Sequence, residues 1–141
     1  MVWLHGRAAC WLAWSVFAGA FFASLAPAVA SEKSFPFGSE LILDASPMRG
    51  SKRIPMIEIE EGGAASIDLW CASLQAHADV GDDGSVSIVP SPASPAQCTP
   101  ERQSGDDNLL AALSQVTGWR RHGDVIEFSG ATTLRFRLMT N

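Results

Sequence analysis

The longest strand-like run in this chain is Ile67-Asp68-Leu69-Trp70-Cys71-Ala72-Ser73-Leu74-Gln75-Ala76-His77-Ala78-Asp79-Val80. Apolar residues alternate along it with period two, as in a strand that is buried on one face. They are odd-numbered up to Cys71 and even-numbered from Leu74 on, so the apolar face switches between these residues. One extra residue in a strand has this effect. We therefore predict a single long strand with a β-bulge or sharp bend near Ala72.

Shorter alternating segments on both sides of this run predict further strands. Gly, Pro and Asp punctuate the chain between them, as in tight turns, and Asp82-Asp83-Gly84 marks the turn after the long strand. Together, the predicted strands cover residues 40–44, 53–60, 67–80, 85–88, 125–128 and 133–138.

One segment, residues 106–116, has the pattern of an amphipathic helix. Ser104 and Asp107 fit a capping box, Asp106 is an alternative cap, and Gly118 fits the position of a C-terminal stop. The apolar stripe that would face the sheet consists of Leu109, Leu110, Leu113 and Val116. The sequence thus predicts a mainly β (α+β) fold, an antiparallel curled sheet packed against one α-helix.

The first 30 residues resemble an export signal. Arg7 provides a weakly basic start, an apolar run over residues 8–26 follows, and Ala28-Val29-Ala30 fits the small-x-small pattern before a cleavage site. We expect cleavage after Ala30. The alternative is an uncleaved membrane anchor, because the apolar run is long enough to cross a bilayer.

Behind the signal, we expect residues 31–39 to be a flexible lead-in and residues 40–141 to form a single domain. The chain is acidic, with 15 Asp and Glu against 10 Lys and Arg. Binding to nucleic-acid phosphates needs clustered basic residues, so we expect no nucleic-acid partner. Contact with a membrane is expected only through an uncleaved signal segment.

Two cysteines, Cys71 and Cys98, follow the signal segment. Oxidising compartments favour a disulfide between them. It would close a loop of about 27 residues and contribute about 3.5 kcal/mol in the chain-entropy model. The alternative is a redox or metal site with His77 or His122 as further ligands, although the spacing differs from that of zinc sites.

The spacing of polar residues does not match a known catalytic motif. The serines lack the G-x-S-x-G pattern, and the sequence has neither a phosphate-binding glycine loop nor a calcium loop. The acidic pairs at residues 82–83 and 106–107 have structural roles available, in a turn and at a helix start. We expect no catalytic residues, no cofactor, no metal and no enzymatic activity. A hydrolase alternative rests on His77 and nearby acids.

Five short motifs occur in an order that matches a known family. Trp70-Cys71-Ala72 stands where a Gly-Cys-Asn motif would stand, and Ala96-Gln97-Cys98 stands where a second cysteine precedes a helix. The helix and closing strands are matched by Leu109-Leu110-Ala111-Ala112-Leu113, Ile126-Glu127-Phe128 and Leu134-Arg135-Phe136. In these motifs, over residues 40–139, the chain resembles the META domain (HslJ-like) family of bacterial envelopes. The resemblance implies a partly open antiparallel barrel packed on one helix, a role associated with envelope stress, drug resistance, motility or secretion, and no established catalytic residues.

The resemblance and the export signal together indicate a non-enzymatic periplasmic or secreted protein. It would bind an envelope protein or a small apolar ligand. The alternative is a lipid-handling or secretion-pilot-type carrier with an apolar cavity in the half-barrel. Its candidate lining residues, which otherwise simply fill the core, are Leu74, Ala76, Ala78, Leu134 and Phe136.

The signal and the disulfide are tested together by the intact mass of protein recovered from the periplasm. We expect the mass of Ser31–Asn141 less two hydrogens, and no thiol that reacts with an alkylating reagent before reduction. A full-length mass would show an uncleaved anchor, and free thiols would contradict the predicted disulfide.

Overall fold

The computed structural model of this protein describes residues 34–94 and 97–139, so the predicted signal of residues 1–30 lies outside the described residues. Within them, eight strands and one α-helix follow one another along the chain. Their bounds are β1 Leu41–Leu43, β2 Met56–Ile59, β3 Ala64–Asp68, β4 Ser73–Val80, β5 Val86–Pro90, α1 Pro100–Leu113, β6 Val116–His122, β7 Val125–Gly130 and β8 Leu134–Leu138.

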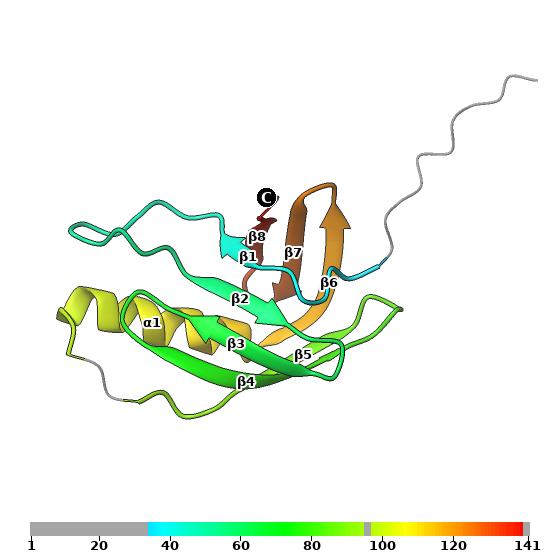
Figure 1. Ribbon diagram of the computed structural model, residues 1–141, viewed down its shortest axis with the longest axis horizontal. Helices are drawn as coiled ribbons and strands as arrows, with labels where there is room; N and C mark the ends of the chain where they lie inside the picture. Colours follow the sequence, from blue (N-terminus) through cyan, green and yellow to red (C-terminus); the bar gives the residue numbers. More distant parts are fainter. Residues whose placement is uncertain (1–33, 95–96, 140–141) are drawn as a thin grey trace, which may run out of the picture.

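The strands form one antiparallel sheet in the order β5-β4-β3-β2-β1-β8-β7-β6. Neighbours in the sheet are also neighbours in the sequence, except that the first strand pairs with the last through Leu41↔Leu138 and Leu43↔Phe136. The sheet curls until its two edges meet at the bridge Ser85↔Gly118, and α1 packs against β5 (Figure 1). The prediction of a mainly β, partly open barrel with one helix is confirmed.

The core lies inside this curled sheet because alternate residues of each strand point inward. In β2 these are Ile57 and Ile59, as the sequence predicts, each 1% exposed. From α1, Leu109 and Leu113 complete the core. Burial of these apolar side chains is the main favourable contribution to folding.

The seam between the sheet edges is held by Trp119 of β6. Its backbone N–H donates to Gly84 O at 2.8 Å and its indole Nε1 donates to Gly81 O at 3.0 Å, both in the β4–β5 turn. Gly84 has a φ of +88°, which few other residues tolerate. In the same turn, the side chain and the backbone N–H of Ser85 donate to the Asp83 carboxylate and hold its pKa below the ordinary value. This small contribution to stability is therefore present near neutral pH and is lost as the pH falls through that lowered pKa.

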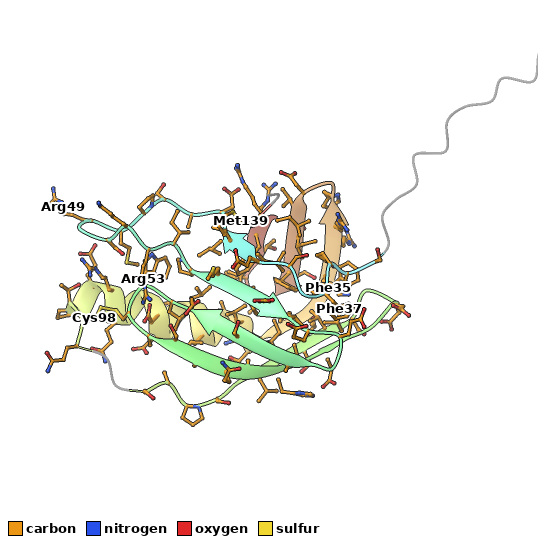
Figure 2. All side chains as sticks on the ribbon, in the orientation of Figure 1. Phe35, Phe37, Arg49, Arg53, Cys98 and Met139 are labelled. Carbon is orange, nitrogen blue, oxygen red and sulfur yellow. A yellow bond between two sulfur atoms is a disulfide. The ribbon has the colours of Figure 1, made fainter. Side chains whose placement is uncertain are left out.

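The expectation that residues 31–39 form a flexible lead-in is wrong for residues 35–38, which pack against the barrel. Phe35 is 7% exposed, and its ring centroid lies 5.1 Å from that of Trp119 and 5.0 Å from that of Phe37 (Figure 2). Gly38 N–H donates to Ile59 O at 2.8 Å. The ring of Phe35 belongs to the core cluster, where it also lies 6.2 Å from the ring of Phe128.

The prediction that residues 67–80 form one continuous strand is wrong, because they belong to two antiparallel strands, β3 and β4, and the turn between them. Residues 69–72 form a tight turn, closed by the Leu69 N–H donating to Ala72 O at 2.8 Å, and the chain reverses from β3 into β4. The switch of apolar parity is real, but a turn causes it rather than a bulge within one strand.

The helix prediction is wrong at both ends. The helix α1 begins at Pro100, after Thr99 as N-cap, so Ser104, Asp106 and Asp107 lie within it rather than capping it. Pro fits the first helical position because its φ is already suitable and its missing N–H is not needed there. The last turn ends at Leu113.

The residues beyond Leu113 belong to β6, which the sequence analysis missed. Val116 and Trp119 are both buried although they are three positions apart, a spacing typical of a helix. A register shift between Val116 and Gly118 puts both side chains on the inner face of the strand. Gly118 therefore lies in a strand and does not stop a helix. The final hairpin, β7 and β8, agrees with the prediction.

In the described part of the chain, no helix has the length and apolar composition that a membrane crossing requires.

Replacing Phe35 by Ala should destabilise the barrel by about 3–5 kcal/mol, the usual cost of truncating a buried aromatic ring. Phe37→Ala is the matched control, because Phe37 is only partly buried and should cost clearly less. Guanidinium unfolding of both variants, with the disulfide intact, measures the difference. Equal losses would contradict the buried position of Phe35.

Candidate functional site

A hollow of about 270 Å³ opens beside α1. Its walls come from three parts of the chain: the β3–β4 turn, α1, and the connector that follows β5. The residues lining it are Leu69, Cys71, Ala72, Ala93, Ser94, Gln103, Asp106, Asp107 and Leu110. We regard this hollow as the candidate functional site.

One side of the hollow is built by a carboxylate that holds the β3–β4 turn. Three consecutive backbone N–H groups donate to Asp106: Trp70 N to Oδ1 at 3.0 Å, and Cys71 N and Ala72 N to Oδ2, each at 3.1 Å. These amides point the same way because the turn reverses the chain here. Amides shielded from water need a partner, and Asp106 supplies it for these three, of which that of Trp70 is fully buried.

The carboxylate of Asp106 is itself buried, with 5% of the residue exposed. A carboxylate can accept about four hydrogen bonds, so the three amides leave one acceptor position on Oδ1. Arg102 lies one helical turn earlier, but its guanidinium donates to Gly50 O at 2.6 Å. Asp106 forms no ion pair with any cation of residues 34–94 or 97–139.

The position of α1 against the turn depends on Gly105. A Cβ atom at Gly105 would overlap the Met48 methyl group and lie 3.2 Å from the Trp70 ring. The Trp70 indole therefore lies close to the helix backbone, with Met48 beside it. This close approach explains why the helix contains Gly next to Asp106.

The disulfide joins the same two elements covalently. Cys71 in the turn and Cys98, just before α1, are bonded with 5.9 Å between their Cα atoms, so the structure contains the predicted pair. Figure 2 places Cys98 and Arg49 at the same end of the molecule, where α1 begins. Turn and helix are thus held together by a covalent bond and by three hydrogen bonds to Asp106.

The histidines considered for chemistry lie away from the hollow. His77 is exposed on β4, with Nε2 3.4 Å from Asp79 Oδ1, and His122 is exposed at the end of β6. Neither lines the hollow, and they are not brought together. Among the described residues, no group of three or more His, Cys, Asp or Glu side chains could hold a metal ion.

The five residues proposed to line an apolar cavity belong to the barrel interior. Leu74, Ala76, Ala78 and Phe136 are buried in the core cluster, and Leu134 packs against it. None of them lines the hollow beside α1.

Sequence reasoning found Cys71 and Cys98 of this site but missed the role of Asp106. It assigned Asp106 to a helix cap, because an acid before an apolar stripe is a common cap signal. The available hint was Gly105 directly before it, since Gly inside a helix often marks a close approach of another element.

Replacing Asp106 by Ala should destabilise the protein by about 3 kcal/mol or more, because three amides lose their acceptor and each unsatisfied group costs about 1–3 kcal/mol. Asp107→Ala removes the same charge from the next residue, which is exposed, and should change stability by about 0.5 kcal/mol or less. Denaturant unfolding of the oxidised proteins measures both. A similar loss for the two variants would contradict the role given to Asp106.

Neither a family model nor a curated protein sequence matches the chain. Solved structures do show the same fold. A DUF4847 family protein from Bacteroides vulgatus is 15% identical with a TM-score of 0.50; the match covers 59% of this chain and 57% of that protein. A protein from Burkholderia xenovorans solved by NMR is 18% identical with a TM-score of 0.58, over 74% of this chain and 84% of that one. A second NMR structure gives 15% identity and a TM-score of 0.57, over 72% and 89%. At these identities the likeness shows a shared fold and nothing about activity.

Proposed function

We propose that this protein is an exported, META-like accessory domain of the bacterial envelope that acts by binding a partner protein rather than by catalysis. The observation that carries the proposal is the hollow beside α1, whose walls are joined by the Cys71–Cys98 disulfide. A hollow fixed in this way is pre-organised, so binding costs little conformational entropy.

The disulfide also supports the proposed compartment. Structural disulfides persist in the periplasm and outside the cell, and they are rare in the cytosol. This agrees with the export signal expected at residues 1–30. The two lines of support are independent, since one comes from the N-terminal sequence and the other from the pairing of Cys71 with Cys98.

The carrier alternative has weaker support. A lipid carrier needs an apolar cavity inside the barrel, and the residues proposed to line it are packed in the core cluster or against it. Small barrels are usually filled by their own side chains. The hollow beside α1, at about 270 Å³, is below the usual size of pockets for drug-sized ligands, about 300–1,000 Å³.

Site-specific photo-crosslinking in the cells that naturally make the protein tests the proposal. A photoreactive residue at Gln103, which is exposed and lines the hollow, should give a discrete crosslinked protein in the envelope fraction. The matched control is Thr132, which is exposed in the β7–β8 turn. The proposal fails if Gln103 gives no adduct, or if both positions give the same adducts.

A further inference from the structure

The hollow beside α1 combines an apolar floor with two carboxylates, neither of which forms an ion pair within residues 34–94 and 97–139. The apolar surface comes from Leu69, Cys71, Ala72 and Leu110, and the carboxylates are those of Asp106 and Asp107. Among the described residues that line it, there is no Lys, Arg or His. Asp107 is exposed at the rim, and Asp106 is buried in the wall.

Buried charges in proteins are normally paired, because leaving a carboxylate without a counter-ion in a low-dielectric site is costly. The three amides from the β3–β4 turn compensate part of the Asp106 charge by hydrogen bonding. They are neutral groups, and one acceptor position on Oδ1 remains. A donor that also carries a positive charge would complete the site.

The size of the hollow limits what can supply that charge. A volume of about 270 Å³ suits one extended side chain better than a drug-sized molecule. Lys and Arg side chains bury an apolar stem and keep a charged head beside polar groups. The stem would lie on Leu69, Ala72 and Leu110, and the head would reach Asp107 and the free position on Asp106.

The charge that would attract such a partner belongs to the hollow and its immediate neighbours. Of the seven acidic residues from Ile54 to Pro100, only Asp68, which directly precedes Leu69, lies next to the β3–β4 turn. The turns that contain Glu60 and Asp82 are at the opposite end of the strands. An acidic site attracts a partner of the opposite sign and raises the rate of encounter.

We propose that the hollow binds a lysine or arginine side chain presented by a basic segment of a partner protein. This inference rests on the proposed function and adds the chemistry of the partner to it. The arrangement can recognise one cationic side chain in an exposed loop or tail, with specificity from the charge and affinity from the apolar stem.

The test is a titration of the oxidised, isotope-labelled protein, as recovered from the periplasm, followed by amide NMR signals. The probe is the capped peptide Gly-Ser-Lys-Ser-Gly, compared with the same peptide carrying norleucine in place of lysine. The amide signals of Ala72, Gln103 and Leu110 should shift on addition of the lysine peptide. The norleucine peptide should bind at least about tenfold more weakly, because it lacks the charge that pairs with a carboxylate.

Two variants separate the hollow from the general acidity of the surface. Asp107→Asn should weaken binding of the lysine peptide about three- to fivefold, as expected for loss of an exposed ion pair. Glu101→Gln removes an equal charge from an exposed position on α1 that does not line the hollow, so it should change the affinity less than about twofold.

Three results would overturn the inference: no shift at the hollow, equal binding of the two peptides, or equal effects of the two variants. A crosslinked partner recovered at Gln103 would leave the proposed function standing in each of these cases. If the lysine peptide shifts the signals but no partner is crosslinked, this inference stands, because the hollow recognises the side chain. The proposed envelope function is then contradicted.

Discussion

The arrangement of the helix on the barrel depends on one carboxylate. Asp106 accepts hydrogen bonds from three successive amides of the β3–β4 turn, so a single side chain satisfies one buried and two partly buried backbone groups. Hydrogen bonds to a charged acceptor are among the stronger ones in proteins, each contributing about 1.5–3 kcal/mol. This gain offsets the cost of burying the charge. The same turn also lines the hollow, places Trp70 beside Gly105 and carries Cys71 of the Cys71–Cys98 disulfide.

The barrel is closed at a different place by different means. At the seam, Trp119 links β6 to the β4–β5 turn through its backbone and its indole, and Phe35 packs against the same indole. Two regions therefore hold the elements together. At the Phe35 end, aromatic contacts join the two sheet edges; at the Cys98 end, the disulfide and the hydrogen bonds to Asp106 join the β3–β4 turn to α1 (Figure 2). The core between them consists of strand residues that point inward, with Leu109 and Leu113 from α1.

The sequence contained enough information for most of the sheet, because period-two alternation marks β2, β4, β5, β7 and β8 directly. The predictions are wrong at the places where the alternation of apolar and polar residues is interrupted. The parity change near Ala72 was assigned to a bulge but is a turn, whereas the real register shift at Val116–Gly118 made a strand look like the end of a helix. The start of α1 was hidden because its first turns are polar and are held by Arg102 and by Trp70 packing on Gly105. Of the candidate site, Cys71 and Cys98 could be inferred from composition and compartment. The role of Asp106 could not, since its partners are amides that lie 34 to 36 positions away in the sequence.

The pairing of β1 with β8 has a consequence for the time at which the chain can fold. All other strand pairs join elements that are close in sequence, whereas residues 41–43 pair with residues 136–138. Contacts between distant residues require closure of a long loop and form late. During synthesis the first strand can pair with β2 early, but its other edge has no partner until residues 134–138 of β8 have left the ribosome. The five strands β1 to β5 can therefore pair as they are made, whereas the barrel as a whole can close only after the final hairpin has been synthesised.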